Sequence, residues 1–293
     1  MAQSNFGLGL HQQQGAIINL APTGIVAKGK NASHVPLTHD QIIEDVACCL
    51  ELGVQIFHLH ARKQDESHSC DPEDYGRLIE SIRNLPGGKE AVVVVTTSGR
   101  TDPNFEARSR ILDLDGAMKP DMASLTLSSL NFMQGASINE PDTIRSLAQR
   151  MHEKGIKPEL EIFDLGMLNF AKVLLKEKLL SDVVYCNLLL GNIAGAQAEL
   201  LHVGTLLSGI PDDWITCIAG IGQSQLSANT LGILYADGAR VGLEDNLWYD
   251  KSRTTQASNS QLVERVVRIS KELQRPIAQR ADVRLRLGLN EII

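Results

Sequence analysis

The sequence predicts one α/β domain over residues 16–293, folded as a single-domain (β/α)8 TIM barrel after a polar N-terminal tail at 1–15. Two observations carry this prediction. Short apolar, β-rich runs alternate eight times with helical stretches, and nearly every run ends in polar residues or glycine. Such alternation requires parallel strands joined by right-handed crossovers. A closed barrel is therefore expected, with a doubly wound open sheet as the alternative.

The expected strands are short, as suits strands better than helices. In chain order they begin at Ala16 (AIINLAPTG), Val54 (VQIFHLHAR), Ala91 (AVVVVTTSG), Met122 (MASLTLSSLN), Lys157 (KPELEIFD), Val183 (VVYCNLLLG), Trp214 (WITCIAGIG) and Gly238 (GARVGLEDN). No linker or low-complexity tract suggests a second domain.

Start and stop signals mark three of the intervening helices. Thr38 precedes an amphipathic stretch and is suited to cap it. Pro141 falls in the first turn of a second helix, and Gly155 ends it. Ser258 and Gln261 form a capping box before a third helix. These signals support a helix between successive strands.

Composition excludes several classes of protein. A net charge of −7 and an aromatic content of 4% argue against nucleic-acid binding. No apolar run is long enough for a membrane span, and Met1–Gly15 does not resemble a secretory signal. The cysteines show no CxxC spacing, which favours buried, reduced thiols in a cytoplasmic protein. They are Cys48, Cys49, Cys70, Cys186 and Cys217.

The residues that end the barrel strands are the candidates for chemistry, because active sites of this fold lie at that end. His58 and His60 end the second run, and strand alternation turns both imidazoles to the same side. They can share one divalent metal, although a pair of structural histidines is the alternative. The other histidines are poorly placed, so Glu244 after the eighth run is the expected third ligand.

A second group of strand-end residues suits acid–base chemistry and anion binding. Asp245 next to the metal ligand is a plausible general base, and Arg240 would orient it or bind a substrate carboxylate. Thr96 and Ser98 offer hydroxyls, and Gly99 offers an accessible backbone N–H. An ordinary strand end and turn would also account for these last residues.

The order of these motifs resembles the β-keto acid cleavage enzymes, whose founding activity is 3-keto-5-aminohexanoate cleavage. The resemblance covers almost the whole chain, and FHLHAR followed by RVGLEDN is its most specific part. The matching stretches are APTG (21–24), VPLT (35–38), FHLHAR (57–62), PDMASLTLSSLNF (120–132), PELEIFDLGM (158–167), LLLG (188–191), IAGIG (218–222), RVGLEDN (240–246) and the segment 259–272.

The resemblance implies a zinc-dependent acyltransferase of the β-keto acid:acetyl-CoA type, usually a homotetramer. A β-keto acid and acetyl-CoA would give a new acyl-CoA and acetoacetate, with zinc on His58, His60 and Glu244. An aspartate matching Asp245, oriented by Arg240 and Thr96, would remove the C2 proton.

Further positions match residues that contact the substrate in this family. Ser124 and Thr126 match positions that hold the substrate carboxylate, and Glu159, or its same-face neighbour Glu161, matches a glutamate near the far end of the substrate. Val26 stands where relatives that act on amino substrates carry a glutamate, so a neutral β-keto acid is expected here. The competing functions are a metal-dependent hydrolase or aldolase on the same fold, and a barrel that only binds a small molecule.

Overall fold

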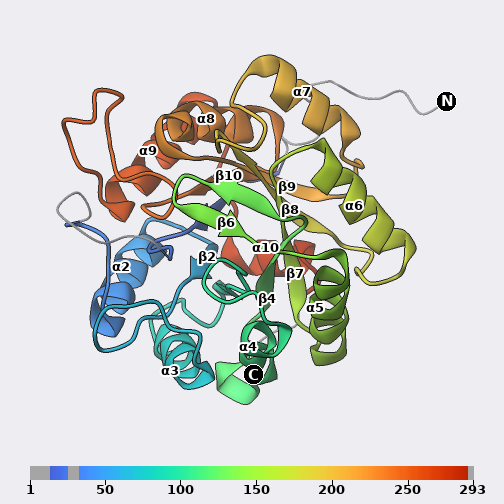
Figure 1. Ribbon diagram of the computed structural model, residues 1–293. Helices are drawn as coiled ribbons and strands as arrows, with labels where there is room; N and C mark the ends of the chain where they lie inside the picture. Colours follow the sequence, from blue (N-terminus) through green and yellow to red (C-terminus); the bar gives the residue numbers. More distant parts are fainter. Residues whose placement is uncertain (1–13, 26–32, 290–293) are drawn as a thin grey trace.

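The chain folds as a closed barrel of eight parallel strands, in the order β1-β10-β9-β8-β7-β4-β3-β2 (Figure 1). The computed structural model describes residues 14–25 and 33–289. Each of the eight expected runs contains one barrel strand, so the predicted fold class is confirmed. The strands are β1 (Ile17–Leu20), β2 (Ile56–Leu59), β3 (Val92–Val95), β4 (Met122–Thr126), β7 (Lys157–Ile162), β8 (Tyr185–Leu190), β9 (Ile215–Gly220) and β10 (Gly238–Val241).

Helices surround the barrel, and the predicted caps are in place. Thr38 and Gln41 form a capping box at the start of α2, and Ser258 and Gln261 form another at α9. Gly155 ends α5 in the left-handed conformation, with φ of 61°. The helices are α2 (His39–Glu51), α3 (Pro72–Arg83), α4 (Phe105–Ser109), α5 (Pro141–Lys154), α6 (Leu165–Lys176), α7 (Leu200–Gly209), α8 (Gln225–Tyr235), α9 (Asn259–Glu272) and α10 (Arg280–Arg286), with 3-10 turns η1 (Arg110–Asp113), η2 (Gly116–Met118) and η3 (Gly222–Ser224).

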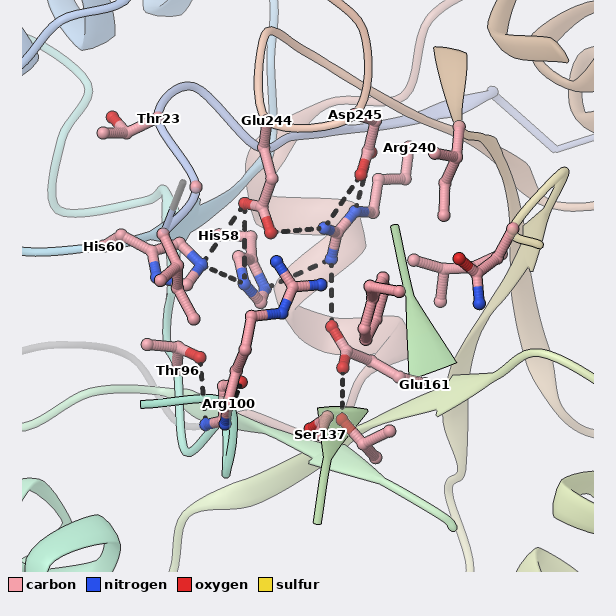
Figure 2. A pocket seen from close by; sticks show the side chains of 18 of the residues that line it. Thr23, His58, His60, Thr96, Arg100, Ser137, Glu161, Arg240, Glu244 and Asp245 are labelled. Carbon is pink, nitrogen blue, oxygen red and sulfur yellow. Dashed lines mark hydrogen bonds and ion pairs between the residues drawn. The ribbon is translucent and has the colours of Figure 1, made fainter. Parts of the chain in front are cut away.

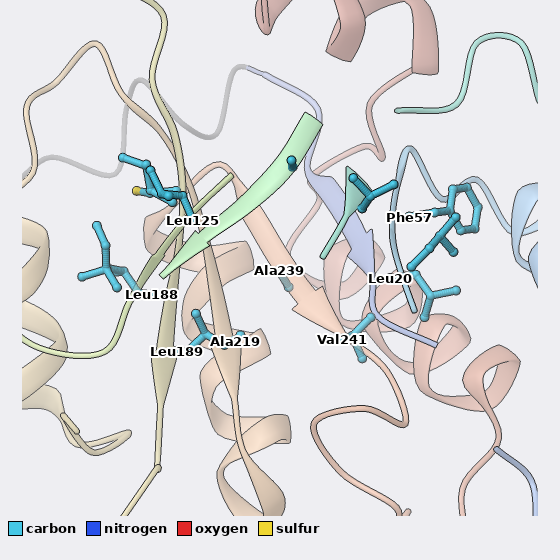
Figure 3. Close-up of a cluster of buried hydrophobic side chains, with 14 of the residues drawn as sticks. Leu20, Phe57, Leu125, Leu188, Leu189, Ala219, Ala239 and Val241 are labelled. Carbon is cyan, nitrogen blue, oxygen red and sulfur yellow. The ribbon is translucent and has the colours of Figure 1, made fainter. Parts of the chain in front are cut away.

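Two apolar layers hold the barrel together. The larger one fills the space between strands and helices, and includes Leu20, Phe57 and Leu188 (Figure 3). The smaller one packs Val283 and Leu287 of α10 and its C-terminal turn with residues inside the barrel, namely Ile17, Ile56, Val92, Val94, Met122, Tyr185, Ile215 and Cys217. Several of these are first residues of their strands, so α10 closes the amino-terminal end of the barrel. The opposite end stays available for a site.

A small hairpin between β4 and α5 was not predicted from the sequence. Its strands, β5 (Leu130–Phe132) and β6 (Gly135–Ser137), pair antiparallel, and Gly135, the first residue after the turn, has φ of 141°. Figure 1 shows the hairpin across the mouth of the barrel. Strands this short produce no alternation that a sequence pattern can detect.

The thiols are free, but the expectation that all are buried is wrong. Cys48 and Cys70 are exposed, whereas Cys49, Cys186 and Cys217 are buried. Neighbouring residues of a helix point about 100° apart, so α2 can bury Cys49 while Cys48 faces outward. Among the described residues, no helix is long and apolar enough to cross a membrane.

Candidate metal centre and substrate cavity

A cavity of about 440 Å³ opens at the carboxyl ends of the barrel strands (Figure 2). This volume is typical of a site for a small molecule. His58, His60 and Glu244 line one side of it, and Arg240 and Asp245 lie next to them. The candidate residues predicted at the ends of the second and eighth strands therefore line one cavity.

The three predicted metal ligands converge on a single point. His58 Nε2 lies 3.3 Å from His60 Nε2, and Glu244 Oε2 lies 3.3 Å from His60 Nε2 and 3.9 Å from His58 Nε2. Glu244 reaches this point because Gly24 leaves room: a Cβ on Gly24 would lie only 2.7 Å from the Cγ of Glu244. A side chain at this position of the APTG motif would therefore displace Glu244, which explains why the position is a glycine.

Glu159 fixes the orientation of the His58 ring through Nδ1, the ring nitrogen that faces away from the convergence point. His58 Nδ1 donates to Glu159 Oε2 at 2.5 Å, while Asn19 and Asn187 donate to Glu159 Oε1 at 2.6 and 2.8 Å. Burial alone would raise the pKa of Glu159, but His58 and the other partners outweigh it and the pKa lies below its ordinary value. A carboxylate oxygen can only accept, so Nδ1 carries a proton and the ring turns Nε2 toward the convergence point. Burial lowers the pKa of His58, but Glu159 outweighs it and the pKa lies above its ordinary value, so a metal at this point would displace a proton from Nε2.

The donor atoms fit a divalent metal. Burial lowers the pKa of His60 to about 4, so this imidazole is neutral at pH 7, as a ligand must be. Glu244 Oε2 is buried and has no hydrogen-bond partner among the described residues. A buried carboxylate oxygen left unpaired is costly unless a cation or a donor occupies the space before it. Two imidazoles and one carboxylate form a common catalytic zinc set.

A second group of possible ligands, His58, Glu159 and Glu161, lies on the other side of the His58 ring. The oxygens of Glu159 already accept hydrogen bonds from His58, Asn19 and Asn187. Glu161 accepts from Thr126 at 2.6 Å. Among the described residues, neither Glu159 nor Glu161 has a buried oxygen without a hydrogen-bond partner, as Glu244 does, so this group is the weaker candidate for a metal site.

Arg240 joins the carboxylates beside the metal site. Its guanidinium lies 3.1 Å from Glu244, 3.1 Å from Asp245 and 3.3 Å from Glu161. Burial raises the pKa of Asp245 to about 6, although Arg240 acts in the opposite direction. Burial thus makes Asp245 a stronger base than an ordinary aspartate.

The predicted substrate-binding residues divide into two sets. Thr96, Ser98 and Thr126 line the cavity. The hydroxyl of Thr96 accepts from the Ser98 backbone N–H at 3.2 Å, and no hydrogen bond joins it to Asp245 among the described residues. The hydroxyl of Thr126 donates to Glu161. The hydroxyls of Thr96 and Thr126 thus face the cavity but already take part in hydrogen bonds within the protein.

Ser124, Gly99 and Glu159 do not line the cavity. Ser124 is buried and its hydroxyl accepts from the Thr97 backbone N–H at 3.2 Å. A Cβ on Gly99 would overlap the Ile138 carbonyl oxygen, so this glycine serves close packing. Of the two glutamates expected near the substrate, Glu161 faces the cavity.

Sequence reasoning missed Arg100 and Phe132, which also line the cavity. Arg100 comes one residue after the TTSG strand end, a position that could have marked it. Phe132 comes from the unpredicted hairpin, for which Gly135 between two short runs was the available signal. Val26, the position expected to influence substrate choice, lies outside the described residues.

Fold and site together define a (β/α)8-barrel enzyme with a candidate metal site at the carboxyl ends of its strands. The chain belongs to the β-keto acid cleavage enzyme family, whose model matches residues 15–289. Membership confirms the expected class, an acyltransferase that cleaves a carbon–carbon bond.

Individual relatives support this assignment. The chain is 35% identical to the 3-oxoadipate:acetyl-CoA acetyltransferase of Cupriavidus necator, over 94% of this chain and 95% of that protein. It is 31% identical to the 3-keto-5-aminohexanoate cleavage enzyme of Fusobacterium nucleatum, over 94% and 98%. The solved complex of ObcA with oxaloacetate superposes with a TM-score of 0.76 at 19% identity, over 88% of this chain and 68% of that one, which supports the fold alone.

Proposed function

We propose that this enzyme converts a β-keto acid and acetyl-CoA into an acyl-CoA and acetoacetate, with zinc held by His58, His60 and Glu244. One observation carries the proposal: three inward-facing ligand atoms lie beside an Arg240–Asp245 pair, and one of them is a buried carboxylate oxygen with no hydrogen-bond partner among the described residues. Relatives named for 3-oxoadipate, 3-keto-5-aminohexanoate and 3,5-dioxohexanoate support the substrate class.

The cavity residues suit removal of a proton next to a carbonyl. A bound zinc would act as a Lewis acid that polarises the keto oxygen of the substrate. Asp245 accepts the C2 proton, and its raised pKa makes it an effective base at neutral pH. Arg240 holds the Asp245 carboxylate in place through its Nε and NH2 groups, at 3.1 and 3.4 Å.

The chemistry that follows conserves atoms between the two substrates. The C2 carbanion attacks the acetyl carbonyl of acetyl-CoA and expels the CoA thiolate. The thiolate then adds to the original keto carbon, and cleavage of the C2–C3 bond releases acyl-CoA and leaves the electron pair on C2. The protonated Asp245 returns its proton to C2, which gives acetoacetate and restores the carboxylate. Glu161 and Thr126, joined at 2.6 Å on the cavity wall, bound the space in which the substrate lies.

A screen of β-keto acids with purified, zinc-loaded protein tests the proposal. We expect turnover only when acetyl-CoA is present, with acetoacetate and the new acyl-CoA formed in equal amounts. Turnover without acetyl-CoA would instead indicate a hydrolase or an aldolase, and binding without any turnover would indicate a binding protein.

The expected homotetramer and cytoplasmic location stay predictions. Light scattering of the purified protein measures the first, and fractionation of cells that express it measures the second.

A further inference from the structure

Two arginines line the cavity in the described part of the chain, and their surroundings differ. Arg240 is paired with three carboxylates, as described above. The guanidinium of Arg100 has no carboxylate oxygen within 4.0 Å among the described residues, and its Nε has no hydrogen-bond partner there. Figure 2 shows the Arg100 side chain extending into the cavity between the histidines and Glu161. Arg100 is therefore a cation with unused donors.

An aromatic stack holds the Arg100 side chain. Its Cζ lies 3.6 Å from the centroid of the Phe132 ring, and Phe132 meets the edge of Phe163 at 5.7 Å between centroids. Both rings also line the cavity. Contact with a ring face leaves the in-plane N–H groups of a guanidinium free to bind a carboxylate through two hydrogen bonds.

Burial lowers the pKa of Arg100, while Glu244, Glu161 and Asp245 oppose this effect. An arginine in a protein nevertheless stays protonated. A charged group with unpaired donors in a half-buried position lowers its free energy when an anion binds there.

The residues expected to hold the substrate carboxylate are engaged elsewhere. Ser124 lies outside the cavity lining, and its hydroxyl accepts from Thr97. The Thr126 hydroxyl donates its only proton to Glu161. With Arg240 also paired, Arg100 is the cationic side chain that an entering carboxylate can reach.

We propose that Arg100 binds a carboxylate of the β-keto substrate through its N–H fork, with Phe132 as the surface that orients it; this assignment rests on the proposed function. The carboxylate is either the C1 group shared by every β-keto acid or a second one at the far end of a β-keto diacid. Arg100 is thus a substrate-binding residue, and Phe132 is a positioning residue.

Steady-state kinetics of Arg100→Met, Arg100→Lys and Phe132→Leu test the assignment. Loss of a charge-assisted pair predicts a rise in KM for the keto acid of roughly 10- to 100-fold in Arg100→Met, with the KM for acetyl-CoA unchanged. Arg100→Lys keeps the positive charge but not the paired N–H groups of the guanidinium, so its KM for the keto acid should lie between those of the wild type and Arg100→Met. Phe132→Leu should raise the same KM by roughly two- to fivefold.

Arg145→Met is the matched control, because Arg145 lies over the Phe170 ring at 5.2 Å outside the cavity lining. It should leave both KM values unchanged. Metal content and unfolding temperature of each variant exclude misfolding as the cause of a change.

Paired substrates identify which carboxylate binds. A diacid and a monoacid of equal chain length should lose affinity equally in Arg100→Met if C1 is bound, whereas only the diacid should lose affinity if the far carboxylate is bound. Unchanged KM values for both, or a rise confined to acetyl-CoA, would overturn the assignment.

Calorimetry with acetoacetate and with adipate separates this assignment from the proposed function. If the wild-type protein binds one of them, Arg100→Met does not, and no β-keto acid turns over, the proposed function fails while Arg100 remains an anion-binding residue. If both proteins bind both ligands equally, the assignment fails whatever the turnover.

Discussion

Replacing Glu159 with glutamine should weaken metal binding without touching any metal ligand. Glu159 Oε1 accepts from two amides, Asn19 and Asn187, so the carbonyl oxygen of the introduced glutamine would keep that place. Its NH2 group would then face His58 Nδ1, where a carboxylate oxygen now accepts at 2.5 Å. His58 must respond by moving its proton to Nε2, the atom that faces the metal position.

The size of the effect follows from the donors and acceptors. The reverse amide orientation would keep the His58 tautomer but would set the NH2 group against two other NH2 groups, those of Asn19 and Asn187. The first arrangement puts a proton on the atom that must bind zinc, and the second leaves buried NH2 groups without acceptors; reversing either defect costs about 1–3 kcal/mol. We therefore expect zinc affinity to fall by roughly 10- to 100-fold in Glu159→Gln.

Zinc affinity is measured by competition with a chelator, and the unfolding temperature of the metal-free protein reports damage to the fold. Glu161→Gln is the matched control, two residues along the same strand, and should bind zinc almost as the wild type does. Equal affinity in Glu159→Gln and wild type would refute the reasoning about the tautomer. A larger loss in Glu161→Gln would move the metal to the second ligand group.

Three further predictions concern single carboxyl groups. Glu244→Gln should lose zinc while keeping its fold, because Oε2 of Glu244 has no hydrogen-bond partner among the described residues; elemental analysis of the purified variant decides this. Asp245→Asn should retain zinc but turn over roughly a hundredfold more slowly or worse, and a near-normal rate would assign the base elsewhere. Asp45 accepts from Asn259 at 2.6 Å, and burial raises its pKa from 3.8 to about 6. Because the folded pKa lies above the unfolded one, stability from this group is present below pH 4 and is lost as the pH rises through 6. The free energy of unfolding of Asp45→Asn, relative to that of the wild type, should therefore rise by up to about 3 kcal/mol between pH 4 and pH 7. Denaturation at the two pH values measures this, and an equal difference at both would contradict the raised pKa.

The sequence by itself determined the barrel, the end of the barrel that carries the cavity, and the strand-end positions of the three candidate metal ligands. Alternating strand and helix patterns, helix caps such as Thr38 and the spacing of His58 and His60 are local features, and a local pattern can be read from neighbouring residues alone. Closure of the sheet then brings β10 beside β1 and places Glu244 near β2.

Only the tertiary structure decided which of the same-face residues reach the cavity. Alternation assigns Glu159 and Glu161 to one face of β7, but two residues along a strand differ in depth by about 6.6 Å. The stagger of the closed barrel pairs Glu159 with Ser124 and Glu161 with Thr126, which buries the first pair and exposes the second to the cavity. The position of the Arg100 side chain likewise depends on its contact with the Phe132 ring of the hairpin. The two residues belong to different segments, so no local sequence pattern predicts this contact.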